Sequence, residues 1–337
     1  MSPGAHRLAR ARSVRGAHVL DAAGLPPGVE RTRRVTLPGR RTFEYVALGG
    51  GPETLLVHPG GPGLTYHYLR ALLRLASTDL RVVLFHPRGV GHSWAPRRTV
   101  DLTVASLATD VERLRRALAI RHLHLLGYSA GGFVALEYAH RYPERLRSLL
   151  LCATAGSGDE VQAANRRMVA AAPAPQRRRL RALTRARAFE TPEYRKLSEA
   201  IAEPFQTRFL RTVPRDWKAT RSSPTVYREM MCRSGDEFAV DGSIASWDGR
   251  PYYATITVPT AVIVGKYDFF FPSAARAGRS IRSARMTVLA RSSHMAILEQ
   301  PEQFLRAVRS FLEDVVERGR TPGPSRTGGG IPSAPLR

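Results

Sequence analysis

The chain has 337 residues, 43% of them hydrophobic and 24% charged, with a formal net charge of +24 at pH 7. These proportions are ordinary for a globular protein, and the length is enough for one core with an insertion. No apolar stretch reaches the length of a membrane-spanning helix, and the basic N-terminus lacks the apolar segment of a secretory signal, so we expect a cytoplasmic protein without membrane contact.

Arginine supplies almost all of the positive charge, since only three of the 52 basic residues are lysine. The arginines are scattered, and no RNP-type aromatic signature or zinc-finger spacing accompanies them, so we expect no specific nucleic-acid partner. The two cysteines, Cys152 and Cys232, lack the spacing of metal ligands. Nothing in the sequence indicates a metal or an organic cofactor.

Short apolar segments bounded by glycine, proline or polar residues predict the strands of a sheet. Most are apolar throughout, as in strands whose two faces are both covered. In chain order they lie at residues 54–57, 81–85, 123–126, 148–152, 260–264 and 286–289.

Helical patterns alternate with these segments. The first is expected to begin at a cap formed by Asp101, with leucine and valine recurring at helical spacing from 107 to 118. A second covers residues 133–140, and an amphipathic pattern at 304–315 follows the last strand. Strands that alternate with helices predict the α/β class, with a mostly parallel sheet flanked by helices.

Residues 156–249 interrupt this alternation with an arginine-rich helical pattern that proline breaks repeatedly. Ligands of open α/β sheets bind beyond the carboxyl ends of the strands, so we expect this segment to be a helical lid over that edge. The expected organisation is a basic N-terminal arm at 1–40, a core at 41–155 and 250–318, and a disordered tail at 319–337.

The strongest local signal is a Gly-x-Ser-x-Gly motif between an apolar segment and a helical pattern. Its members are Gly127, Ser129 and Gly131. In this setting the serine sits on a sharp turn, and the glycines avoid clashes with the adjoining strand and helix. The start of the helix then directs the N–H of Ala130 at a developing oxyanion. The motif therefore predicts Ser129 as a nucleophile and Ala130 as an oxyanion donor.

A serine nucleophile needs a base, and a carboxylate that orients the base. Asp268 lies just after the predicted strand at 260–264 and is our candidate for that carboxylate. Asp241 and Asp248 are weaker alternatives, because neither follows a clear strand.

The predicted base is His294, which follows the strand at 286–289. Serines of this strand–turn–helix kind are followed along the chain by the acid and then by the histidine. The other histidine after Ser129 is His140, which lies within a predicted helix. Acid, base and serine are thus all expected at the same edge of the sheet.

A glycine-rich turn, HPGGPG, follows the first apolar segment at residues 58–63. Gly61 is our candidate for the second oxyanion donor, and Gly60 and Gly63 allow the backbone of the turn to fold tightly. A purely structural turn is the alternative. A phosphate-binding P-loop is excluded, because no Gly-Lys-Ser/Thr follows.

Several segments together resemble those of α/β-hydrolases, and within that fold they are most similar to the proline iminopeptidases. The resemblance covers about residues 45–318. It implies a triad of Ser129, Asp268 and His294, and release of an N-terminal residue, often proline, from a short peptide. The segments are GGPG at 60–63, PRGVGHS at 87–93, GYSAGGFVALEYAHRYPERLRSLLL at 127–151, VPTAVIVGKYDFFFP at 258–272 and SSHMAILEQPEQF at 292–304.

The sequence thus favours a serine hydrolase that forms an acyl-enzyme, with aminopeptidase activity of the proline iminopeptidase type. An ester, lactone or thioester hydrolase of small-molecule metabolism stays open, as does a noncatalytic ligand-binding protein of the same fold. The expected partner is a small-molecule or short-peptide substrate, and the oligomeric state is undecided.

Aminopeptidase action also requires carboxylates in the lid to hold the α-ammonium group of the substrate. The arginine-rich lid would equally suit a substrate carboxylate or phosphate. The sequence does not single out a pair among the available carboxylates, which are Glu199, Glu203, Glu229, Asp236 and Glu237.

Overall fold

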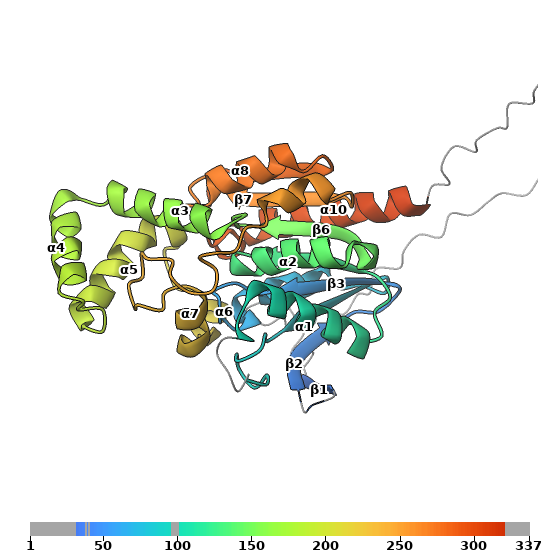
Figure 1. The fold of residues 1–337 in the computed structure, drawn as a ribbon. Helices are drawn as coiled ribbons and strands as arrows, with labels where there is room; N and C mark the ends of the chain where they lie inside the picture. Colours follow the sequence, from blue (N-terminus) through green and yellow to red (C-terminus); the bar gives the residue numbers. More distant parts are fainter. Residues whose placement is uncertain (1–31, 38, 40, 96–100, 321–337) are drawn as a thin grey trace, which may run out of the picture.

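A sheet runs through the centre of the computed structural model, with helices packed against it (Figure 1). The structure describes residues 32–37, 39, 41–95 and 101–320. Most of the expected N-terminal arm, and the expected tail beyond residue 320, lie outside these described residues.

The described residues form eight strands in the order β1-β2-β4-β3-β5-β6-β7-β8. Pairing is parallel from β4 to β8 and antiparallel at β1 and β2, and each predicted apolar segment lies within one strand, so the predicted mostly parallel sheet is confirmed. The strands are β1 Arg33–Leu37, β2 Arg41–Leu48, β3 Glu53–His58, β4 Leu80–Phe85, β5 Leu123–Tyr128, β6 Leu146–Cys152, β7 Thr260–Gly265 and β8 Ala284–Leu289.

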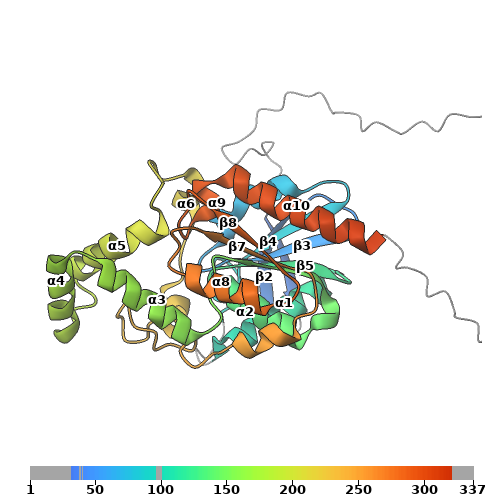
Figure 2. The same ribbon diagram turned by 90° about the horizontal axis from the view of Figure 1, so that it is seen from above.

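Helices cover both faces of the sheet, as the view from above shows (Figure 2). One core lies between the sheet and α1, α2 and α8 and includes Leu125 of β5, whereas the neighbouring Leu126 belongs to a second core beneath η1, α9 and α10. Because β5 is buried on both faces, its sequence is apolar without alternation. These helices are η1 Tyr66–Leu75, α1 Val104–Ala117, α2 Ala130–Arg141, α8 Phe271–Ser280, α9 Ala296–Glu299 and α10 Pro301–Arg320, with short 3₁₀ turns η3 Pro143–Arg145 and η4 Arg250–Thr255.

The segment between β6 and β7, residues 156–249, is called the helical insertion. Its first helices project beyond the sheet and have a small core of their own (Figure 1). Thr191 and Ser223 cap α5 and α7 with their side chains, and proline follows each at the first helical position. The helices are α3 Gly158–Ala171, α4 Ala174–Arg185, α5 Pro192–Gln206, α6 Arg215–Ala219 and α7 Pro224–Met230. No helix in the described part of the chain is both long and apolar enough to cross a bilayer.

Two helix ends differ from the sequence-based expectation. The cap of α1 is Thr103, not Asp101: Thr103 Oγ1 accepts from the Ser106 N–H, and Ser106 Oγ accepts from the Thr103 N–H, each at 3.1 Å. Asp101 instead accepts a hydrogen bond from Arg88 through its carbonyl oxygen. At the other end of the chain, α10 continues to Arg320, past the expected core boundary at 318.

A buried ion pair joins the loop after β4 to α1. The guanidinium of Arg88 bonds Asp110, and both side chains are almost completely buried. The remaining guanidinium donors reach the Asp101 carbonyl at 2.9 Å and the Ser106 carbonyl at 3.0 Å. One arginine therefore holds the start of α1 against the loop.

Replacing Asp110 by alanine should lower the free energy of unfolding by about 3–5 kcal/mol, because it leaves the Arg88 charge buried without its partner. Urea denaturation measures the change. The matched control is Asp314→Ala, which breaks the exposed pair with Arg285 and should cost less than about 1 kcal/mol. Equal losses in the two variants would contradict this account of the pair.

Candidate active site

Ser129 stands at the turn between β5 and α2 in a strained backbone conformation, with φ 54° and ψ −122°. Positive φ is unfavourable for a residue with a side chain. Hydrogen bonds hold the turn: the Ser129 N–H donates to the Cys152 carbonyl at 2.8 Å, and Thr154 Oγ1 donates to the Ser129 carbonyl at 2.7 Å. The neighbouring strand β6 and the residues after it thus keep the serine in place.

The two glycines of the motif permit contacts that no side chain would allow. A Cβ atom at Gly127 would lie 2.3 Å from the Gly131 carbonyl oxygen, and one at Gly131 would lie 2.2 Å from the His58 carbonyl oxygen. Strand, turn and helix therefore touch backbone to backbone, as the sequence predicted. Gly132 has a comparable role, because a Cβ there would lie 2.2 Å from Thr154 Oγ1.

The three predicted residues meet in one hydrogen-bonded series beyond the ends of β5, β7 and β8. His294 Nε2 lies 3.0 Å from Ser129 Oγ, and His294 Nδ1 lies 3.0 Å from Asp268 Oδ1. Asp268 and His294 are both buried. An imidazole between a hydroxyl and a carboxylate can take the hydroxyl proton while the carboxylate fixes its tautomer.

The loop that carries Asp268 and the loop that carries His294 are tied to each other. The Lys266 N–H donates to the Leu289 carbonyl and the Tyr267 N–H donates to the Ser292 carbonyl, each at 3.0 Å. Asp268 Oδ1 also accepts from the Phe270 N–H at 2.8 Å. These bonds hold the Asp268 carboxylate in position independently of its contact with the imidazole.

The alternative acids take part in other contacts. Asp248 pairs with Arg250 at 2.7 Å, and Asp241 accepts from the Ser234 N–H. His140, the other histidine in this part of the chain, stacks on Tyr252 with ring centroids 4.0 Å apart.

The glycine-rich turn lies against the serine. A Cβ atom at Gly60 would be 2.7 Å from Ser129 Cβ. The Gly60 N–H is occupied, since it donates to Tyr68 Oη at 2.7 Å. The N–H groups of Gly61 and Ala130 donate to no other group in the described part of the chain. Gly63 packs on the helical insertion, where the Ser223 N–H donates to its carbonyl at 2.9 Å.

Two histidines near this turn are unsuited to act as bases at neutral pH. Burial lowers the pKa of His58 to about 4, and its Nδ1 bonds the Pro59 carbonyl at 2.8 Å. Burial lowers the pKa of His86 to about 3, and the charges of His67 and His92 act in the same direction. Both rings stay neutral in the interior.

Several residues that support the site gave no recognisable signal in the sequence. Tyr128 Oη donates to the His294 carbonyl at 2.6 Å, and Tyr68 packs edge-on against Tyr128. The Phe269 ring lies 4.3 Å from the His294 ring, centroid to centroid. A Cβ atom at Gly265 would lie 2.3 Å from the Ser293 carbonyl oxygen. These contacts join segments far apart in the chain, which a local pattern does not reveal.

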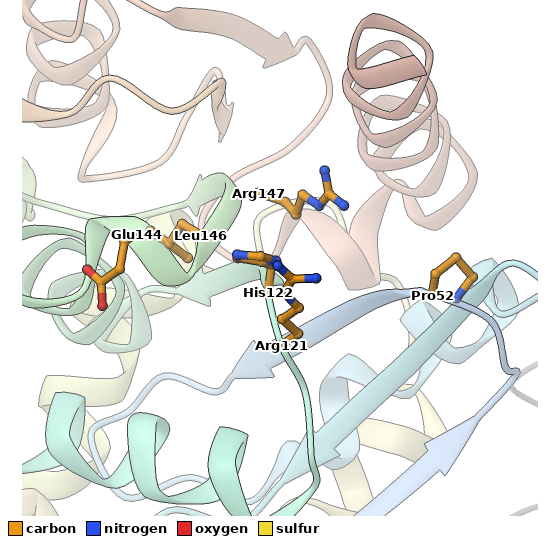
Figure 3. A pocket seen from close by; sticks show the side chains of 6 residues that line it. All are labelled: Pro52, Arg121, His122, Glu144, Leu146 and Arg147. Carbon is orange, nitrogen blue, oxygen red and sulfur yellow. The ribbon is translucent and has the colours of Figure 1, made fainter.

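The hollow in Figure 3 lies at the opposite, amino-terminal end of the parallel strands. It measures about 560 Å³, and Arg121, His122 and Arg147 are among its lining residues. Burial first, and then neighbouring arginine charges, lower the pKa of His122. None of the predicted site residues lines this basic hollow. No group of three or more histidine, cysteine, aspartate or glutamate side chains suited to a metal ion occurs among the described residues.

Comparisons with known proteins agree with this fold. A family model described as the alpha/beta hydrolase fold matches residues 53–301. The proline iminopeptidase of Saccharolobus solfataricus is 29% identical over 278 residues, covering 81% of this chain and 89% of that protein. That of Lactobacillus helveticus is 27% identical over 266 residues, covering 78% and 90%. The crystal structure of a proline iminopeptidase from Mycobacterium smegmatis matches with a TM-score of 0.76 and 26% identity, over 86% of this chain and 100% of that one.

Gly131→Ala should lower the free energy of unfolding by about 1–3 kcal/mol, since the added methyl group would press on the His58 carbonyl and force the backbone apart. Urea denaturation measures the loss. Gly50→Ala is the control, because a Cβ there would meet nothing closer than the Thr78 carbonyl oxygen at 3.8 Å. A Gly131→Ala protein as stable as the control would show that the backbone contact is not tight.

Proposed function

The chain belongs to the α/β-hydrolase fold family, and on this premise we propose that it is a serine hydrolase of the proline iminopeptidase type, which releases an N-terminal residue through an acyl-enzyme. The observation that carries the proposal is the hydrogen-bonded series from Ser129 through His294 to Asp268. The lid role of the helical insertion is part of the same proposal. The cytoplasmic location expected from the sequence stays a prediction.

In the acylation step, Ser129 Oγ attacks the substrate carbonyl carbon and His294 Nε2 takes the hydroxyl proton. Asp268 accepts the Nδ1–H hydrogen bond, which selects the tautomer with a free Nε2 and stabilises the imidazolium that forms. The imidazolium then protonates the leaving amine. Water attacks the acyl-enzyme in the second step, with His294 again taking the proton.

Gly61 and Ala130 supply the N–H groups that stabilise the oxyanion of the tetrahedral intermediate. Their lack of other acceptors in the described structure supports this role, as does the occupied N–H of Gly60. Donors that are fixed before the reaction stabilise the developing charge without reorganisation. The positive end of the α2 dipole lies at Ala130 and acts in the same direction.

An aminopeptidase must also hold the amino group of its substrate, and we assign this role to Glu237 of the helical insertion. Tyr227 Oη donates to Glu237 Oε2 at 2.7 Å. Tyr227 belongs to α7, and Ser223, which caps the start of this helix, bonds Gly63 in the turn beside Ser129. Glu237 therefore belongs to the part of the helical insertion that faces the glycine-rich turn.

Charges of both signs lie near Glu237. Loss of hydration raises the pKa of Glu237 above its ordinary value, and the charges of Asp236 and Glu199 act in the same direction, whereas the Tyr227 hydrogen bond and the Arg228 charge act in the opposite direction. A carboxylate in such a field gains by pairing with an ammonium group. Of the other candidates, Asp236 accepts from Tyr194 Oη at 2.7 Å and Glu229 pairs with Arg233 at 3.3 Å.

Some arginines of the helical insertion are paired with its own acids. These pairs are exposed and lie on the surface of α4, α5 and α7. They are Arg179 with Glu193, Arg195 with Glu190, and Arg228 with Glu190.

Ser129→Ala should abolish fluorophosphonate labelling and lower kcat for proline-arylamide by about 10⁶-fold, the scale of loss when a triad nucleophile is removed. Ser280→Ala, an exposed substitution at the end of α8, is the control and should match the wild type. Labelling without proline release would favour an ester, lactone or thioester hydrolase. Absence of labelling in the folded wild type would favour a noncatalytic binding protein.

Glu237→Gln should raise KM for proline-arylamide about tenfold while leaving hydrolysis of a simple aryl acetate unchanged, because the acetate has no amino group to hold. In the wild type, KM for the arylamide should rise as the pH falls through the raised pKa of Glu237, since protonation removes the charge that binds the ammonium group. Steady-state kinetics with both substrates measure the effect, and Glu313→Gln on α10 is the control. Equal effects on both substrates would rule out this role.

A further inference from the structure

The end of α5 lies along the loop that carries His294. The His294 N–H donates to the Phe205 carbonyl and the Met295 N–H donates to the Gln206 carbonyl, each at 2.9 Å. On the other side, Tyr128 Oη holds the His294 carbonyl at 2.6 Å. The backbone of the histidine is therefore fixed between the core and the helical insertion.

A single carboxylate, that of Glu299, extends this contact. Glu299 Oε1 accepts from the Phe209 N–H at 2.8 Å and from Ser293 Oγ at 2.8 Å. Glu299 Oε2 accepts from the Ser293 N–H. Ser293 Oγ in turn accepts from the Arg208 N–H at 3.2 Å. Glu299 thus bonds the residue directly before His294 and the helical insertion at the same time.

Two of the three donors that Glu299 satisfies belong to Ser293 and have no access to water. Ser293 is completely buried, so both its N–H and its hydroxyl need acceptors within the protein. A carboxylate accepts several hydrogen bonds at once, and the bonds to its charge are stronger than those to a neutral group. An uncharged side chain of the same shape would leave at least one of these donors facing another donor.

Pro204 separates this docked segment from the rest of α5. It lies inside the helix and has no N–H to donate to the preceding turn. Proline is a common site of helix bending. The helix thus lacks one backbone hydrogen bond just before the residues that bond the histidine loop.

We propose that Glu299 is a positioning residue, which locks the loop of the base and the end of α5 into one hydrogen-bonded unit. Seating of the helical insertion then sets where the imidazole of His294 stands relative to Ser129. The proposal rests on the proposed function, since it requires His294 to be the base. Glu299 touches neither Ser129 nor the imidazole in the described contacts and acts through Ser293 and the backbone.

Glu299→Gln tests this role with a change of one atom. The substitution should lower the rate of fluorophosphonate labelling of Ser129, and kcat for proline-arylamide, by about 10- to 100-fold, the scale expected when a reacting group is displaced by about 1 Å. KM should stay near that of the wild type, and the melting temperature should fall by a few degrees, because a buried donor loses its acceptor. Amide exchange at Ser293 and Phe209, measured by hydrogen–deuterium exchange, should become faster.

Glu302→Gln is the matched control, because Glu302 lies one turn further on and pairs only with the exposed Arg74 at 2.6 Å in the described contacts. It should label at the wild-type rate. If Glu299→Gln labels at that rate too, the proposal is overturned. It is also overturned if the fraction of the variant that is unfolded at the assay temperature accounts for the whole loss of labelling.

Ser293→Ala decides the matter if the Glu299 variant does not fold. It removes the hydroxyl that bridges Arg208 and Glu299 while keeping the backbone N–H. Slower labelling with an unchanged melting temperature would support the proposal, and unchanged labelling would overturn it. Failure of the proposed function gives a different result, because labelling that depends on Ser129, or proline release, would then be missing from the wild type itself, whatever happens at Glu299.

Discussion

The strained turn at Ser129 is the constraint on which the rest of the structure depends. A non-glycine residue with φ 54° stores on the order of 1–3 kcal/mol, which the surrounding structure must offset. The offset comes from β6, through the bonds of Cys152 and Thr154, and from close backbone contact at Gly127 and Gly131. The turn places the Ser129 hydroxyl beyond the end of β5, at the start of α2.

The order of strands then determines which side chains can meet the serine. Parallel pairing from β5 through β6 and β7 to β8 brings the carboxyl ends of these strands to one edge. Asp268 and His294 lie beyond two adjacent strands, and Gly265 lets their loops touch. Residues separated by more than a hundred positions therefore come within hydrogen-bond distance because they follow strands of the same sheet.

The helical insertion is attached at both sides of this site. Near the glycine-rich turn, Ser223 bonds Gly63, and near the histidine loop, Phe205 bonds His294. A ligand held by the helical insertion would thus be linked through a few hydrogen bonds to the glycine-rich turn and to the His294 loop. This arrangement gives a physical route by which binding energy from remote parts of a substrate could act on the reacting groups.

The sequence by itself predicted the parallel sheet, because strands buried on both faces must be apolar throughout, as β5 is. It also predicted the serine turn, since few residues other than glycine tolerate such contact, and it placed Asp268 and His294 at strand ends. Only the tertiary structure decided that Thr103 caps α1 and that Glu237 and Glu299 stand out among many similar carboxylates. Their contacts join segments distant in the chain, and the energy of such a contact is absent from any local pattern until the fold brings its partners together.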